Sequence, residues 1–216
     1  MKNRFDLVVF DWDGTLYDSI PFIVGCLQAA ANDCGRPHPS AGAARSVIGL
    51  SLQRAMRELF APADDGECEE LISAYRRHYA AREAGPTDLF VGVADLLVRL
   101  REGGYRMAVA SGKSSRQLAT ALDATGTAAW FDTLRGPDQT ASKPDPLMLR
   151  EIMRDLNAVP ERTLMVGDSL HDLQMAVNAG VDAVAVACGA NSVDELRTLQ
   201  PLCCLQQTRE LAGLLL

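Results

Sequence analysis

The sequence predicts an α/β protein: a doubly wound, Rossmann-like parallel sheet core with an inserted all-helical cap domain. Short apolar runs typical of buried strands alternate with helical patterns over most of the 216 residues. One stretch, 19–85, interrupts this alternation with helical patterns alone. We therefore expect an α/β core formed by residues 1–18 and 86–216, and a helical cap formed by residues 19–85.

The expected core strands are apolar stretches bounded by charged residues or glycine, and the expected core helices carry apolar residues at helical spacing. The strands are expected at 5–10, 105–110, 163–166 and 181–187. The helices are expected at 93–100, 114–122, 146–156 and 170–179. In the tail we expect a helix at 193–199, an edge strand at 202–205 and a last helix at 209–214.

The expected cap begins near Pro21, a residue suited to the first turn of a helix. Helical patterns follow at 22–31, 51–60 and 67–82, with glycine and proline between them and Gly85-Pro86 after the last. An all-helical insertion after the first strand of such a sheet is typical of a lid domain that covers a ligand site.

The composition excludes some classes of partner. The net charge of −7 opposes nucleic acid, whose binding needs clustered cations. No apolar run is long enough to cross a bilayer, so we expect a cytoplasmic protein without a membrane partner, as a monomer or homodimer. The six cysteines lack paired C-x-x-C spacing and the three histidines are scattered, which disfavours zinc.

Polar residues follow several of the expected strands. Asp11-Trp12-Asp13-Gly14-Thr15 follows the first, Ser111-Gly112-Lys113 the second, and Gly167-Asp168 begins a segment that ends at Asp172. Lys143 precedes the helix expected at 146–156. Because doubly wound sheets bind ligands at the carboxyl ends of their strands, these groups should meet at one edge.

Such a cluster of carboxylates calls for a cation. Two like charges ~4 Å apart repel by roughly 4 kcal/mol at an effective dielectric of 20. Mg²⁺ prefers hard oxygen ligands and leaves positions for water and a substrate phosphate. The residues therefore predict a magnesium site.

The segment Asp11-Trp12-Asp13-Gly14-Thr15-Leu16 resembles the first signature of the haloacid dehalogenase superfamily of phosphohydrolases. Ser111, Lys143 and residues 167–172 resemble its second, third and fourth signatures, in the right order. The small helical cap and Asp18-Ser19 are similar to those of its phosphoglycolate phosphatase-like members. The resemblance implies a Mg²⁺-dependent phosphatase that acts on a small phosphorylated metabolite.

The resemblance also implies roles for the site residues. Asp11 would be the nucleophile that forms an aspartyl-phosphate, and Asp13 the general acid and base. The metal would be held by the Asp11 and Asp168 carboxylates and the backbone carbonyl of Asp13. Lys143 would neutralise phosphate charge.

The remaining signature residues would support this centre. Ser111 and the backbone amide of Gly112 would bind phosphate oxygens, although Gly112 replaces the asparagine often found there. Gly14 would allow the backbone to turn sharply past the site, and Thr15, the next residue, would also support the site. Asp172 would orient Lys143 or a metal-bound water.

Substrate choice is expected to lie in the cap. Arg45 is our candidate for gripping an anionic substrate tail, chosen from the arginines at 45, 54, 57, 76, 77 and 82. Trp12 is expected to pack in the core, and His171 to lie in a loop near the entrance.

Other functions stay open. A β-phosphoglucomutase-like phosphotransferase would carry the same core signatures, and a receiver-like phospho-acceptor module combines similar groups, although this chain is long for one. A dehalogenase is disfavoured by Asp13, and phosphonoacetaldehyde hydrolysis by the lack of a cap lysine.

Overall fold

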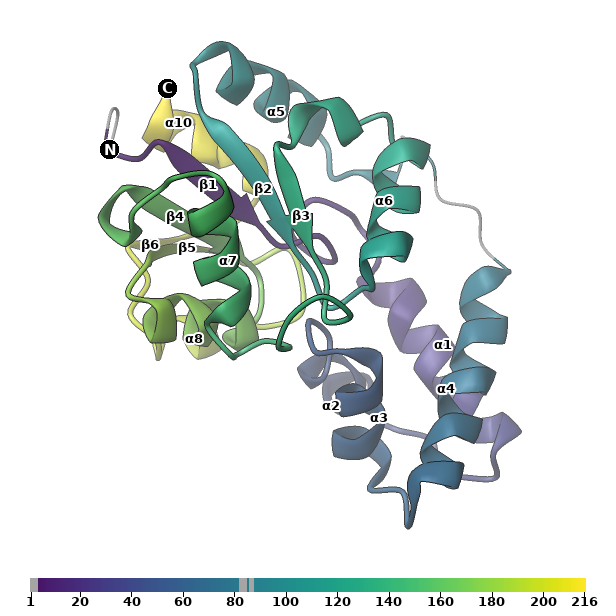
Figure 1. Cartoon of the computed structure of the whole chain (residues 1–216). Coiled ribbons are helices and arrows are strands. Elements are labelled where there is room, and N and C mark those ends of the chain that lie inside the picture. The colour runs from purple at the N-terminus through teal and green to yellow at the C-terminus, as the bar shows by residue number, and fades with distance from the viewer. Residues whose placement is uncertain (1–3, 82–84, 86–87) are drawn as a thin grey trace.

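The structure, a computed structural model, describes residues 4–81, 85 and 88–216. Within these residues the strands form one six-stranded sheet in the order β3-β2-β1-β4-β5-β6, and every pair is parallel (Figure 1). The strands are β1 Leu7–Phe10, β2 Arg106–Ala110, β3 Thr133–Arg135, β4 Thr163–Gly167, β5 Asp182–Val186 and β6 Cys203–Leu205.

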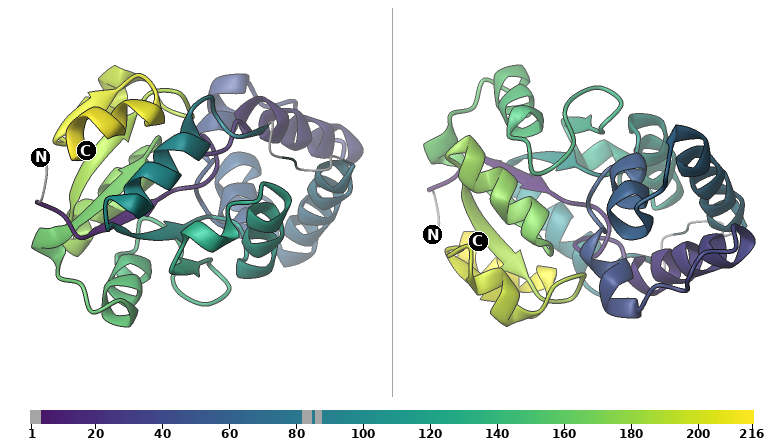
Figure 2. Two further views of the ribbon diagram at one scale, coloured as in Figure 1. Left: turned by 90° about the horizontal axis from the view of Figure 1, so that it is seen from above. Right: turned by 90° about the horizontal axis from the view of Figure 1, so that it is seen from below.

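Helices cover both faces of this sheet (Figure 2). Val8 and Phe10 point to one face and pack with α5, α6 and α10, whereas Leu7 and Val9 point to the other and pack with α7, α8 and α9. The core helices are α5 Val93–Glu102, α6 Ser115–Ala124, α7 Leu147–Asp155, α8 Leu170–Ala179, α9 Val193–Arg197 and α10 Ala212–Leu215. Short 3-10 helices lie at Ala128–Trp130, Pro160–Arg162 and Thr208–Leu211.

The inserted helices form a separate lobe beyond the carboxyl ends of the strands (Figure 1). They are α1 Ile20–Asp33, α2 Ala41–Ser46, α3 Leu52–Phe60 and α4 Asp65–Ala80. Their apolar faces share a hydrophobic cluster distinct from the two clusters of the sheet. Pro21 lies in the first turn of α1, and the Asp64 side chain caps α4 by accepting a hydrogen bond from the Glu67 amide at 2.9 Å.

The expected fold class is confirmed, including the edge strand β6. Two elements were not expected from the sequence: β3, which has three half-buried residues and ends in Arg135, and the six-residue helix α2. Both are too short to show a clear hydrophobic period. The helix expected at 67–82 spans Asp65–Ala80.

The division into core and cap ends at residues 85 and 86, and residue 86 lies outside the described part of the chain, so this boundary stays a prediction. In the described residues, no helix has the length and apolar character needed to cross a bilayer.

Candidate active site

Asp11 and Asp168 lie at the ends of two neighbouring central strands. Phe10 in β1 pairs with Val166 in β4, so the residues that follow these strands meet at the same edge of the sheet. The sheet reverses its winding between β1 and β4, which is where doubly wound folds form their ligand crevice. Both carboxylates are buried.

A buried lysine joins two of the acidic residues. Lys143 Nζ donates to Asp11 Oδ1 at 2.5 Å and to Asp172 Oδ1 at 2.6 Å, and its side chain is fully buried. Burial disfavours the ammonium ion, but the adjacent carboxylates of Asp11 and Asp172 outweigh that effect and raise the pKa of Lys143. Lys143 is therefore a fixed cation beside Asp11.

The negative charge of the cluster exceeds what this one lysine balances. Asp11, Asp168 and Asp172 each offer an oxygen within 4.8 Å of the others. Burial, together with the charge of Asp172, raises the pKa of Asp168 from 3.8 to about 7. Burial also raises the pKa of Asp11, against the opposing effect of Lys143 and with help from the neighbouring aspartates. A further cation would relieve this repulsion.

Hydrogen bonding distinguishes the three carboxylates. Asp172 accepts from Lys143 on one oxygen and from the Ser169 amide and hydroxyl, at 3.1 and 2.6 Å, on the other. Asp168 accepts one bond on each oxygen, from Thr15 Oγ1 at 2.8 Å and the Ala190 amide at 2.6 Å. Asp168 thus keeps lone pairs free, and Asp172 serves as the anchor of Lys143.

These donors fit a small hard cation. Buried carboxylate oxygens from two adjacent strand ends are ligands that Mg²⁺ prefers. Asp11 and Asp168 are the carboxylates best placed to hold it. The role of the Asp13 carbonyl in this set stays a prediction.

Two glycines allow the chain to pass close to Asp168. Gly14 has φ +85°, and a Cβ built there would lie 2.3 Å from Asp168 Oδ2. At Gly189 a Cβ would lie 1.9 Å from the same atom. Gly189 was not singled out from the sequence, because a glycine after a strand carries no specific signal by itself.

Asp13 makes contacts that sequence reasoning missed. Ser19 Oγ donates to Asp13 Oδ1 at 2.6 Å, and Lys113 Nζ donates to Oδ2 at 2.5 Å. Burial disfavours the Lys113 ammonium, but the Asp13 carboxylate outweighs this and raises the pKa of Lys113. The ammonium also lies 5.0 Å from the ring centroid of Tyr79 in α4. In the sequence, the only indication of the contact between Lys113 and Asp13 is the position of Lys113 two residues after Ser111.

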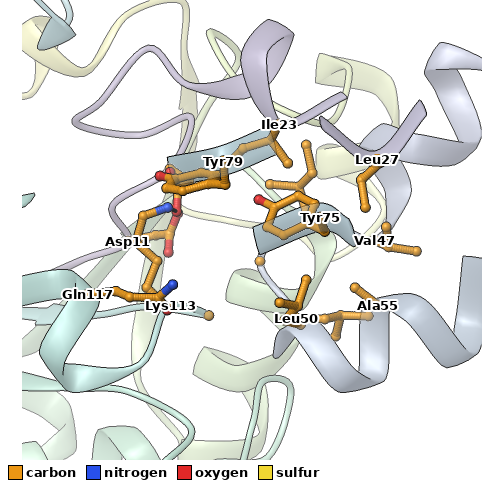
Figure 3. Close-up of a pocket in the computed structure, with 15 residues that line it drawn as sticks. Asp11, Ile23, Leu27, Val47, Leu50, Ala55, Tyr75, Tyr79, Lys113 and Gln117 are labelled. Atoms are coloured by element: carbon orange, nitrogen blue, oxygen red, sulfur yellow. Dashed lines mark hydrogen bonds and ion pairs between the residues drawn. The ribbon is translucent and has the colours of Figure 1, made fainter. Parts of the chain in front are cut away.

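A pocket opens from Asp11 and Asp13 toward the cap, and we call it the cap pocket (Figure 3). Its core side includes Gly112, Lys113 and Gln117. Its cap side includes Tyr75 and Tyr79 and these apolar residues: Ile23, Leu27, Val47, Leu50, Leu52 and Ala55. The space between these residues, together with the open solvent at its entrance, amounts to about 610 Å³. A small molecule bound at Asp11 would extend into it.

The other expected site residues divide between the pocket and its surroundings. Ser111 is fully buried after β2, and its hydroxyl accepts from the Lys113 amide at 3.2 Å. His171 lies in α8, not in a loop, and its Nε2 lies 2.9 Å from the Ser46 carbonyl of the cap. Trp12 is fully buried in the hydrophobic core.

Arg45 is exposed in the last turn of α2 and does not line the cap pocket, and its expected contact with a substrate stays a prediction. Arg54 donates to the Lys143 carbonyl at 3.3 Å, and Arg57 and Arg77 pair with Asp65 and Asp33. Arg82 lies outside the described residues.

Residues 8–186 match the family model of haloacid dehalogenase-like hydrolases. A probable phosphatase, IndB, from Dickeya dadantii is 36% identical over 96% of this chain and 92% of its own length. The phosphoglycolate phosphatase of Pseudomonas putida is 32% identical over 91% of this chain and 79% of its own length. The tyrosine-protein kinase PtkA of Mycobacterium tuberculosis is 35% identical over 87% of this chain, which spans 64% of that protein.

The fold is similar to that of solved structures. A haloacid dehalogenase-like hydrolase from Bacteroides fragilis superimposes with a TM-score of 0.87 at 26% identity, covering 96% of this chain and 99% of the other.

Proposed function

We propose that this chain, which belongs to the haloacid dehalogenase-like hydrolase family, is a Mg²⁺-dependent phosphatase that hydrolyses a small phosphate monoester through an aspartyl-phosphate. The observation that carries the proposal is the buried cluster of Asp11, Asp168, Asp172 and Lys143, of which Asp11 lines the cap pocket. Its geometry suits a nucleophilic carboxylate beside a fixed cation.

The first displacement uses Asp11 and Asp13. A carboxylate oxygen of Asp11 attacks phosphorus while the bond from phosphorus to the ester oxygen breaks, and the Asp13 carboxyl gives its proton to the departing alkoxide. Both aspartates line the pocket that would receive the leaving group. Lys143, held against Asp11 at 2.5 Å, offsets charge on the phosphoryl oxygens. Bound Mg²⁺ would supply charge neutralisation and orientation of the phosphoryl group.

The second displacement restores the enzyme. Asp13 takes a proton from water, whose oxygen attacks phosphorus of the aspartyl-phosphate, and the bond to Asp11 breaks to release phosphate. Ser19 Oγ, 2.6 Å from Asp13 Oδ1, orients this carboxyl group through both steps.

The Asp11→Asn variant tests the nucleophile. We expect loss of Mg²⁺-dependent phosphate release by about a thousandfold or more, because the amide is a poor nucleophile. The matched control is Asp123→Asn, which changes an exposed carboxylate outside the site and should leave release unchanged. Retained turnover in Asp11→Asn would contradict the assignment.

Phosphoglycolate is the reference substrate, since a relative is named for it. We further propose that the protein is cytoplasmic and acts on a free metabolite as a monomer or homodimer, without a nucleic acid or membrane partner, in keeping with its net charge of −7.

The competing function is phosphoryl transfer to a hydroxyl other than water, of which β-phosphoglucomutase-like chemistry is one form. It is favoured by relatives that are named as tyrosine-protein kinases. Incubation with a sugar phosphate distinguishes the two, because a transferase forms a new ester whereas a phosphatase releases phosphate.

A further inference from the structure

We propose that the substrate's leaving group is uncharged, with an apolar body and a hydrogen-bond acceptor, rather than a carboxylate as in phosphoglycolate. This inference rests on the proposed phosphatase function and concerns the part of the substrate that the cap pocket surrounds. The cap pocket is described above by its lining residues.

Apolar side chains dominate the cap side of this pocket. They come from α1, from the segment between α2 and α3, and from α3 itself, and so surround the space opposite Asp11 (Figure 3). Ile23, Leu27 and Leu50 are examples, and each is at least nine-tenths buried. A wall of this kind stabilises an apolar body by removing it from water, and it offers a carboxylate no partner.

The one cation among the described lining residues is already committed. Lys113 is held by Asp13 at 2.5 Å and lies over the Tyr79 ring. The arginines described for the cap lie outside the lining, several of them in ion pairs with cap aspartates or glutamates. A carboxylate tail would therefore lose its hydration without gaining a free cation.

One hydroxyl in the wall has no partner in the described residues. The Tyr75 side chain lines the pocket and is 8% exposed, and its hydroxyl makes no hydrogen bond within the described part of the chain. In Figure 3 this hydroxyl points from the apolar side toward the space in front of Asp11 and Lys113. It is not one of the fully buried polar atoms that lack a partner, so it can be reached from the pocket and is suited to donate to a substrate acceptor.

Three esters that differ only at the far end of a ring test the inference: benzyl phosphate, 4-carbamoylbenzyl phosphate and 4-carboxybenzyl phosphate. With Mg²⁺ we expect the carbamoyl ester to have a kcat/KM at least about tenfold above that of its carboxylate isostere. Benzyl phosphate should likewise exceed phosphoglycolate. Equal values, or a preference for either carboxylate, would overturn the inference.

Two variants test whether the cap pocket causes this preference among the esters. Tyr75→Phe should lower kcat/KM for the carbamoyl ester by about three- to tenfold and leave benzyl phosphate within about twofold. Gln53→Ala, a change on the exposed face of α3, should leave the carbamoyl-to-carboxylate ratio unchanged. A collapse of that ratio in Gln53→Ala, or no effect of Tyr75→Phe on the carbamoyl ester, would count against the pocket as the source of selectivity.

These experiments distinguish a failure of the phosphatase proposal from a failure of the proposal about the leaving group. Phosphate release from phosphoglycolate in preference to the uncharged esters would sustain the phosphatase and reject the inference. If no ester is hydrolysed, the phosphatase proposal fails. Binding of the three benzyl esters to Asp11→Asn, measured by calorimetry, still tests the inference, since the same order of affinities is expected without turnover.

Discussion

At the residue scale, the site depends on how closely the backbone can approach Asp168. The turn after β1 brings Gly14 against one oxygen of this carboxylate, while the Thr15 hydroxyl holds the other. A side chain at Gly14 would have to displace Asp168 itself. The backbone at Gly14 therefore helps to fix the position of Asp168, one of the carboxylates proposed to hold the metal.

Gly14→Ala tests this contact. We expect the Mg²⁺ concentration for half-maximal activity to rise by about tenfold or more, because the new Cβ lies 2.3 Å from Asp168 Oδ2. Stability should fall by ~1–2 kcal/mol from the positive φ. A magnesium titration of phosphate release and urea unfolding provide the two measurements.

Gly126→Ala is the matched control for Gly14→Ala. Gly126 also has a positive φ, +69°, but a Cβ there meets nothing within 4 Å. It should lose similar stability while its magnesium requirement stays unchanged. If both variants showed the same magnesium requirement, backbone strain alone would account for the result at Gly14.

The sequence could predict the site residues that are placed by the ends of strands. It could not predict which residues of the core and the cap lie close to each other. Asp11 and Asp168 come directly after apolar runs, so the sheet topology places them together. Lys113 and Tyr75 act across the gap between core and cap, which depends on how the two pack. Such packing leaves no local pattern in the chain.

At the scale of elements, the loop between α2 and α3 matters most because it lies on the core beside the site. The Ser51 amide donates to Ser142 Oγ at 3.0 Å. A Cβ at Gly112 would lie 2.4 Å from the Leu50 carbonyl oxygen and 2.8 Å from that of Gly49. These contacts describe a cap closed over the site, and they leave no room for a side chain at position 112.

Gly112→Ala should hold the cap away from the core. Backbone oxygens cannot give way as a flexible side chain can, so the whole loop must shift. We expect KM to rise by about tenfold while the free energy of unfolding changes by less than ~1 kcal/mol, since closure and not folding is affected. Steady-state kinetics and urea unfolding measure these two effects.

The control for Gly112→Ala is Gly25→Ala. Gly25 is exposed in the middle of α1, and a Cβ there meets nothing within 4 Å. That variant should gain ~0.5–1 kcal/mol of stability from helix propensity and keep its kinetics. An unchanged KM in Gly112→Ala would show that the loop does not gate the site.

The alternation of strands and helices was predictable because each long element carries a clear hydrophobic period. The hydrophobic period did not predict β3 and α2, because tertiary contacts and not a local pattern stabilise these two elements. β3 pairs along β2 at the edge of the sheet, and α2 relies on a Ser40 cap and the single buried residue Ala44.

At the scale of the whole molecule, the buried carboxylates of the site lower the stability of the folded state. The pKa of Asp168 is raised from 3.8 to about 7, so the folded state binds this proton more tightly than the unfolded state does. Without metal, the contribution of Asp168 to stability is therefore lost as the pH rises from about 4 to about 7. Asp11 acts in the same direction.

Magnesium should reverse this loss, and more so at high pH. We expect the rise in Tm on replacing EDTA with Mg²⁺ to be larger at pH 8.5 than at pH 5.5, because the cation must displace a proton at the lower pH. Thermal unfolding in both conditions measures the difference. Asp168→Asn should keep only the part of this pH dependence that Asp11 contributes, and a magnesium effect that is equal at both pH values in the unaltered protein would contradict the raised pKa values.

The separate hydrophobic cluster of the cap has a consequence for how such an enzyme can change. The cap holds its helices together with its own apolar residues, whereas β1, the strand that precedes Asp11, packs into the two clusters of the sheet. Substitutions that reshape the wall around a leaving group therefore leave the support beneath Asp11 largely untouched. New specificities can accumulate in one lobe while the phosphoryl-transfer machinery of the other is inherited intact.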